Sequence, residues 1–274
     1  MYEIFETILF LSIFGFCVTA VLLLLKPVTS KKFSAKWQYC AWIAVLFIMI
    51  IPFYKFIPQK QIQKIPLAQN QTIQQEIDTV GEADAEAVII QDTPIEYREI
   101  ALTPKFQIRL LDLLSYIWAL GVFAYLTVVM GSYAIYNIKK RRKTVTVAEN
   151  SLLEAVKREL KIKRRVKVRL SEDISSPMLA GVLFPTIYIP CREISDEKMR
   201  MVFLHELTHY RRGDLIVKWF GVFVNAVHWF NPLCYLLCAN LSEACEVSCD
   251  MAVTRNMTDT EQKLYMNTIL ETIE

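Results

Sequence analysis

Histidine is scarce in this chain, with only three among 274 residues. The sequence also lacks an internal repeat, a glycine-rich phosphate-binding loop and a serine-nucleophile motif, which argues against nucleotide-binding and serine-hydrolase functions. The net charge is only +3, and the basic run from Lys157 to Arg169 contains no aromatic residue for base stacking. These features argue against a dedicated nucleic-acid-binding protein and favour contact between the basic run and anionic lipids.

Charge is absent from long stretches of the chain, which is 54% hydrophobic. Three runs, 7–25, 37–54 and 113–138, are long enough to approach or exceed the length needed to cross a hydrocarbon core of about 30 Å. The first run has neither the basic start nor the small-residue cleavage site of a signal peptide. We therefore expect a mainly α membrane protein with three transmembrane helices. Its predicted parts are a transmembrane hairpin (1–58), an extracytoplasmic loop (59–112), a third transmembrane helix (113–138) and a cytoplasmic domain (139–274).

The distribution of lysine and arginine predicts the orientation. The link between the first two hydrophobic runs is basic, a basic run at 139–143 follows the third, and the segment 59–112 is rich in acids. The positive-inside rule therefore places the N-terminus outside and everything from Lys139 onward in the cytoplasm. None of the seven cysteines lies in the predicted outside loop, so we expect no disulfide bonds. The pairs Cys234/Cys238 and Cys245/Cys249 have helical spacing, which is more typical of buried packing than of metal ligands.

Two of the three histidines lie in the motif His-Glu-Leu-Thr-His at 205–209. Positions four apart share one face of a helix, so the imidazoles of His205 and His209 can bind one zinc ion. Glu206 is then placed to act as a general base on water, which is the zinc-peptidase pattern H-E-x-x-H. Ser195 is a suitable N-cap for this helix and Gly213 a suitable left-handed end.

A catalytic zinc usually has three protein ligands and one open position. The sequence offers Glu246, with Glu243 one turn earlier as its competitor and His228 as a further alternative. Residues 215–238 resemble a fourth membrane helix but are interrupted by polar residues and Pro232, which indicates two antiparallel helices turning at Asn231-Pro232. The two legs have similar lengths, so the return helix would bring Glu246 level with His209. We expect the tip, with Trp219, Trp229 and Phe230, to dip into or rest on the membrane.

Several further segments carry a family resemblance. They are Ser-Pro-Met-Leu-Ala-Gly at 176–181, Phe-Pro-Thr-Ile-Tyr-Ile-Pro at 184–190, His-Glu-Leu-Thr-His-Tyr-Arg-Arg-Gly-Asp at 205–214, His-Trp-Phe-Asn-Pro at 228–232 and Glu-Val-Ser-Cys-Asp at 246–250. Together they resemble the bacterial membrane zinc metallopeptidases of the beta-lactam-sensor/antirepressor signal-transducer family. The resemblance covers nearly the whole chain, but an external penicillin-binding sensor domain is lacking. We therefore regard the chain as a fragment or as a member that answers to another signal.

The resemblance implies a gluzincin-like α+β fold in a multi-pass protein of the bacterial cell membrane. It also implies one Zn²⁺ bound by His205, His209 and Glu246, with Glu206 as the base and Asp250 as a supporting acid. Candidates for the oxyanion donor are Tyr210 and His228. The segment from Gly181 to Ile189 is expected to form an edge strand that pairs with an extended substrate.

The predicted function is that of an integral-membrane zinc endopeptidase with a cytoplasmic active site. The resemblance implies two substrates. One is a cytoplasmic regulatory protein such as a transcriptional repressor, and the other is the chain itself, cleaved in transmembrane signalling. The near alternative is a membrane zinc protease of the prenyl-protein or heat-shock type. The alternative from another class is a signal-relay or scaffold protein whose structural zinc has Cys249 or His228 as a fourth ligand. Whether the chain forms a homodimer is left open.

Overall fold

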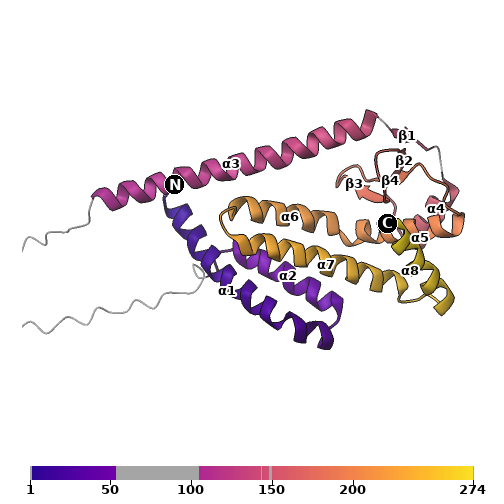
Figure 1. The fold of residues 1–274 in the computed structure, drawn as a ribbon, viewed down its shortest axis with the longest axis horizontal. Coiled ribbons are helices and arrows are strands. Elements are labelled where there is room, and N and C mark those ends of the chain that lie inside the picture. The colour runs from indigo at the N-terminus through magenta and orange to yellow at the C-terminus, as the bar shows by residue number, and fades with distance from the viewer. Residues whose placement is uncertain (1, 54–104, 143, 148–149, 274) are drawn as a thin grey trace, which may run out of the picture.

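The computed structural model describes residues 2–53, 105–142, 144–147 and 150–273 (Figure 1). Most of the predicted extracytoplasmic loop therefore lies outside the described residues. The elements in chain order are α1 (Tyr2–Lys32), α2 (Ala35–Ile50), α3 (Lys105–Arg142), β1 (Thr144–Thr146), α4 (Ser151–Glu159), β2 (Lys167–Ser171), β3 (Met178–Ala180), β4 (Thr186–Pro190), α5 (Asp196–Arg212), α6 (Asp214–Val227), α7 (Pro232–Thr254) and α8 (Asp259–Ile273).

Two of the described helices are long and apolar enough to cross a membrane. They are α1, over Tyr2–Lys32, and the central part of α3, over Leu110–Ile138. The second predicted span, 37–54, corresponds to α2. This helix begins two residues earlier, after the N-cap Ser34, but it already ends at Ile50 and so is shorter than the run. Its 16 residues rise about 24 Å, short of a hydrocarbon core of about 30 Å. One face of α2 is buried against α7, so α2 is also a core helix of the bundle.

The helices α6 and α7 form an antiparallel hairpin, and the turn lies where the sequence predicted it. The side chain of Asn231 caps α7 by accepting a hydrogen bond from the Leu233 amide at 3.0 Å, and Pro232 occupies the first turn. Proline suits this position because the first amides of a helix have no partner within the helix. The turn returns the chain along α6 and so brings the second half of α7 back beside α5 (Figure 1).

The tip of this hairpin packs among α1, α2 and α3, two of which are long and apolar enough to cross a membrane. That the tip dips into or rests on the membrane stays a prediction. His228 Nε2 lies 3.0 Å from the Met49 carbonyl oxygen, and Asn231 Nδ2 donates to Ser12 Oγ at 2.9 Å. Trp229 packs so closely on α3 that a Cβ on Gly121 would lie 2.3 Å from its ring. Trp219 is not at the tip, because it lies in the middle of α6 with its ring against Tyr133 of α3. These contacts join the hairpin to the helical bundle, although the second ring nitrogen of His228, Nδ1, is buried without a hydrogen-bond partner.

The sheet has the order β1-β2-β4-β3, with β2 and β4 parallel and the other pairs antiparallel. The predicted edge strand over Gly181–Ile189 is therefore wrong in position. Tyr188 of β4 pairs with Arg169 of β2 on one side and with Met178 of β3 on the other, so β4 is interior. Gly181 lies in the turn after β3 with φ +86°, a backbone conformation that residues with a side chain rarely adopt. The edge strands of this sheet are β1 and β3, and β3 is the edge strand next to β4.

A second core lies between the sheet and the helices α4, α5 and α8. Phe203, Leu207 and Tyr265 are fully buried there, with Ile187 of β4 against them. This packing holds the middle of α5 between the sheet on one side and α7 and α8 on the other. Residues of α5 around His205 and Glu206 and the outer strand β3 line one cleft.

Candidate metal centre

The motif at 205–209 lies on α5, a helix with well-defined ends. Ser195 caps its N-terminus by accepting a hydrogen bond from the Lys198 amide, and Gly213 ends it with φ +73°. Apolar residues of α5 are buried against the sheet, which leaves His205 and His209 on the face toward α7. The stiff helix sets the separation of the two imidazoles, whose Nε2 atoms are 3.1 Å apart.

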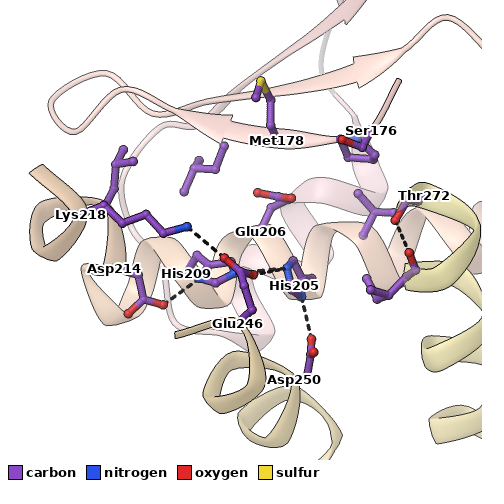
Figure 2. A pocket seen from close by; sticks show the side chains of 15 residues that line it. Ser176, Met178, His205, Glu206, His209, Asp214, Lys218, Glu246, Asp250 and Thr272 are labelled. Atoms are coloured by element: carbon purple, nitrogen blue, oxygen red, sulfur yellow. Dashed lines mark hydrogen bonds and ion pairs between the residues drawn. The ribbon is translucent and has the colours of Figure 1, made fainter. Parts of the chain in front are cut away.

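Glu246 of α7 completes a group of three donor atoms (Figure 2). Its Oε2 lies 3.1 Å from His209 Nε2 and 3.6 Å from His205 Nε2. Ligands about 2.0–2.1 Å from a tetrahedral ion would be about 3.3 Å apart, so the three separations suit one zinc-sized ion. Both imidazoles present the same nitrogen, and a carboxylate faces them. The side chains therefore fit a metal of this size and donor preference.

His205 is oriented through its second ring nitrogen. Nδ1 lies 3.2 Å from Asp250 Oδ1 and 2.7 Å from the hydroxyl oxygen of Tyr265, which itself donates to Asp250 Oδ1 at 2.6 Å. Asp250 lies one turn after Glu246 on α7, as the sequence predicted, whereas Tyr265 lies on α8. A carboxylate on Nδ1 keeps the proton there and leaves Nε2 free for a metal.

His209 is held in the same way from a different part of the chain. Its Nδ1 lies 2.7 Å from Oδ2 of Asp214, the first residue of α6. Tyr39 of α2 donates to the other oxygen, Oδ1, at 2.9 Å. The Arg212 Nε lies 3.3 Å from Asp214 Oδ2, and its guanidinium stands over the Tyr39 ring at 5.1 Å. The Asp214 carboxylate is thus buried but fully partnered.

A cleft of about 450 Å³ opens between this centre and the sheet. Figure 2 shows Glu206 pointing away from Glu246 toward the strands, where the backbone of Leu179 lies close enough to lower the pKa of the Glu206 carboxyl against the effect of burial. Since Leu179 lies in β3, this contact directs the outer edge of the strand toward the cleft. Met178 and Leu179 line one side of the cleft, and Lys218 of α6 lines another. An extended peptide laid along β3 would pass over Glu206.

The charges of the centre are coupled. Burial opposes protonation of His205, but its hydrogen bonds to Asp250 and Glu246 outweigh burial and raise its pKa to about 10. Burial likewise opposes ionisation of Glu246, yet hydrogen bonds from both histidines hold its pKa well below the ordinary value. The pKa of Glu206 is raised, chiefly because burial disfavours its charge. Glu246 is therefore a ready anionic ligand, and Glu206 is the carboxylate better suited to taking up a proton.

Three predicted alternatives are not brought to the cleft. Glu243 faces α1, where its Oε2 lies 2.6 Å from Lys26 Nζ. His228 is at the tip of the α6–α7 hairpin, hydrogen-bonded to Met49, and cannot donate to a substrate over Glu206. Tyr210 follows His209 on α5 but is not among the residues that line the cleft. Of the two oxyanion candidates, neither therefore has support from the geometry.

Two cysteines lie behind the histidines. Cys245 Sγ is 4.0 Å from His209 Nδ1, and Cys249 Sγ is 3.7 Å from the His205 carbonyl oxygen. His205, His209 and Cys249 form one group of nearby donor atoms, and His209, Asp214 and Cys245 form another. We favour the group with Glu246, because its Oε2 lies 3.1 and 3.6 Å from the two Nε2 atoms, whereas the donor atoms of the cysteine groups are only within 4.8 Å of one another. Cys234 and Cys238 lie nearer the N-terminus of α7, where Cys234 contacts Met49 and Cys238 contacts the Gly221 carbonyl.

Four residues of the centre have no role in the sequence analysis: Tyr39, Asp214, Lys218 and Tyr265. Asp214 follows the helix-ending Gly213 and lies five residues after His209, which is a local signal that it could reach the imidazole. Lys218 Nζ lies 2.9 Å from Glu246 Oε1, one turn of α6 beyond Asp214. No local pattern points to Tyr39 or Tyr265, because each reaches the centre only through packing of a distant helix.

Comparison with known proteins gives the chain its family. Residues 6–274 match the family described as BlaR1 peptidase M56. The chain belongs to this family. The resemblance read from the sequence motifs is thereby confirmed: the protein is a member of a peptidase family, and two of its described helices are long and apolar enough to cross a membrane.

Curated relatives agree with this family. The regulatory protein BlaR1 of Bacillus licheniformis is 32% identical over 156 residues, which cover 55% of this chain and 25% of that protein. The methicillin resistance mecR1 protein of Staphylococcus aureus is 22% identical over 276 residues, or 97% of this chain and 46% of its own length. The BlaR1 protein of Staphylococcus aureus is 25% identical with the same coverages. The chain thus spans less than half the length of these relatives.

Proposed function

We propose that this M56 member is an integral-membrane zinc endopeptidase. The observation that carries the proposal is the convergence of His205 Nε2, His209 Nε2 and Glu246 Oε2 within 3.1–3.6 Å of one another, beside a carboxylate that takes no part in the triad. Three protein donors and an open cleft are typical of a catalytic zinc site. Glu206 has the position of a base at such a site.

The chemistry divides between the metal and the chain. Bound zinc would supply a Lewis acid that activates water and polarises the scissile carbonyl. Glu206 would take the proton from the attacking water and deliver it to the leaving amine. Its raised pKa suits this exchange, since the carboxylate must bind a proton and then release it. Asp250 and Asp214 hold the histidines with Nε2 toward the cleft.

The substrate we propose is an extended segment of a regulatory protein, such as a transcriptional repressor, and of the chain itself. The outer edge of β3 beside Glu206 supports binding by strand addition, in which main-chain hydrogen bonds hold the peptide. The relatives named as regulatory and resistance proteins support a role in signalling. The basic residues at the C-terminal end of α3 support a cytoplasmic position for the cleft.

The alternative to a catalytic zinc is a structural zinc. The position of Cys249 is the observation that favours this alternative. Its thiol lies close enough to both histidines to act as a closing ligand. A closed four-ligand site would leave Glu206 without a task. Replacement of Cys249 by serine separates the two: a structural site would lose its zinc, whereas a site built on Glu246 would keep it.

The proposal is tested with the full chain purified in detergent micelles. Wild-type protein should contain about one zinc ion per chain and cleave a candidate repressor or an unfolded protein substrate. Glu206→Gln should retain the zinc and lose about 10²–10⁴-fold in rate. Glu243→Gln is the matched control and should keep both, because Glu243 faces Lys26. Full activity in Glu206→Gln, or zinc-free wild-type protein, would sink the assignment.

A further inference from the structure

The two histidines of the centre share one arrangement. Each Nδ1 meets an aspartate, and each aspartate accepts a hydrogen bond from a tyrosine hydroxyl. For His205 the pair is Asp250 and Tyr265, both from the C-terminal helices. For His209 the pair is Asp214 and Tyr39, and Tyr39 comes from α2 in the N-terminal membrane hairpin. One half of the metal centre is therefore completed by a residue 175 positions away from its aspartate.

We propose that Tyr39 is a positioning residue for the metal site, which acts through Asp214 to hold the His209 imidazole in its ligand orientation. This rests on the proposed zinc function. The Asp214 side chain is only 1% exposed, so its charge cannot be stabilised by water. A buried carboxylate needs a donor for each oxygen, and Tyr39 supplies the donor for Oδ1. Without that donor, Asp214 would be free to turn toward Arg212, and His209 would lose its fixed partner.

The Tyr39 ring is itself buried in the apolar cluster between α2 and α7, and its hydroxyl lies beside Cys245 as well as Asp214. Trp42, Val45 and Leu46 belong to the same cluster farther along the helix, and a phenylalanine at position 39 keeps the ring in it. Arg212 lies over the face of the Tyr39 ring, so the ring contact survives when the hydroxyl is removed. Tyr39→Phe therefore changes the hydrogen bond to Asp214 and leaves the shape of the helix interface in place.

The consequence is a direct link between the membrane bundle and a metal ligand. Partners that orient ligand histidines are worth about 10–100-fold in metal affinity. Loss of Tyr39 leaves the Asp214 carboxylate present but less constrained, so we expect the lower end of that range. A shift of α2 relative to α6 would have the same effect as the substitution, because it would lengthen the same hydrogen bond.

The experiment uses the full chain in detergent micelles and two readouts other than activity. Zinc affinity is measured by competition with a chromophoric chelator, and the coordination geometry by the visible absorption of cobalt-substituted protein. Tyr39→Phe should weaken zinc binding by about tenfold and change the cobalt spectrum. Tyr235→Phe is the matched control, since it loses a hydrogen bond to the Trp229 carbonyl at the far end of the α6–α7 hairpin. It should leave both readouts unchanged.

A double substitution distinguishes positioning from general destabilisation. Asp214→Asn alone should weaken zinc by about 10–100-fold, and adding Tyr39→Phe should cost nothing more, because Tyr39 acts only through Asp214. Additive losses, or wild-type affinity and spectrum in Tyr39→Phe, would overturn the role of Tyr39 while leaving the peptidase proposal intact. Wild-type protein that binds no zinc would overturn both.

Discussion

Glu246 and Glu243 lie one turn apart on α7 but face different partners. Glu246 Oε2 is 3.1 Å from His209 Nε2, whereas Glu243 Oε2 is 2.6 Å from Lys26 Nζ of α1. The turn of the α6–α7 hairpin sets the position of both along the return helix. Which of the two carboxylates reaches the histidines is therefore decided by the register of α7.

Alanine at these two positions should have opposite effects on metal binding. Glu246→Ala removes a proposed ligand, so zinc affinity should fall by more than the ~10–100-fold expected for an orienting residue. Glu243→Ala removes a largely exposed ion pair worth about 0–1 kcal/mol and should leave zinc binding near the wild-type value. Chelator competition on both variants is the measurement. Loss of zinc from Glu243→Ala alone would show that the register of α7 is misassigned.

The partners of His205 should matter less than the ligand itself but still measurably. Asp250→Asn is expected to weaken zinc by about 10–100-fold, because the amide no longer holds the imidazole as a carboxylate does. Tyr265→Phe should have a smaller effect in the same direction, since it removes the hydroxyl that donates to Asp250. Equal affinities in Asp250→Asn and wild type would contradict the orienting role of Asp250.

Zinc affinity should depend on pH above neutrality. The pKa of His205 is raised to about 10 in the metal-free protein, so its imidazole is protonated at pH 7 and must lose a proton to bind zinc through Nε2. Apparent affinity should therefore keep rising between pH 7 and pH 9, whereas a histidine with an ordinary pKa of about 6.5 would give a plateau.

The same titration in Asp250→Asn provides the control. Removal of that carboxylate takes away a hydrogen bond that raises the pKa of His205, so the rise between pH 7 and pH 9 should be less steep. It should not vanish, because the hydrogen bond to Asp214 still raises the pKa of the other ligand, His209. The competing chelator must have a known pH dependence of its own. A wild-type affinity that is flat from pH 7 to pH 9 would contradict the prediction.

The orientation of the chain predicts which sites are open to an external reagent. In a background without the three exposed native cysteines, Gln63→Cys should react with an impermeant maleimide on intact cells. Thr260→Cys, at the start of α8, should react only after lysis, because the positive-inside rule applied to the basic flanks predicts a cytoplasmic position for this part. Labelling of Thr260→Cys on intact cells would refute the proposed orientation.

Local patterns in the sequence determined much of the site. The spacing of His205 and His209 on one helix, the cap at Ser195 and the end at Gly213 are properties of neighbouring residues, and the structure has them where expected. The turn before Pro232 is equally local, and the similar lengths of the two legs then bring Glu246 to His209. Each inference needed only helical geometry and the conformational limits of glycine and proline.

The tertiary structure alone decided the contacts between distant segments. Tyr39 and Tyr265 reach the two aspartates because α2 and α8 pack against α7 and α5, and no short-range pattern records that packing. The edge position of β3, the burial of His228 and the pairing of Glu243 with Lys26 have the same origin. Such contacts depend on which apolar surfaces pack together across the whole chain. Helical periodicity shows that a face is apolar, but it does not show which helix covers that face.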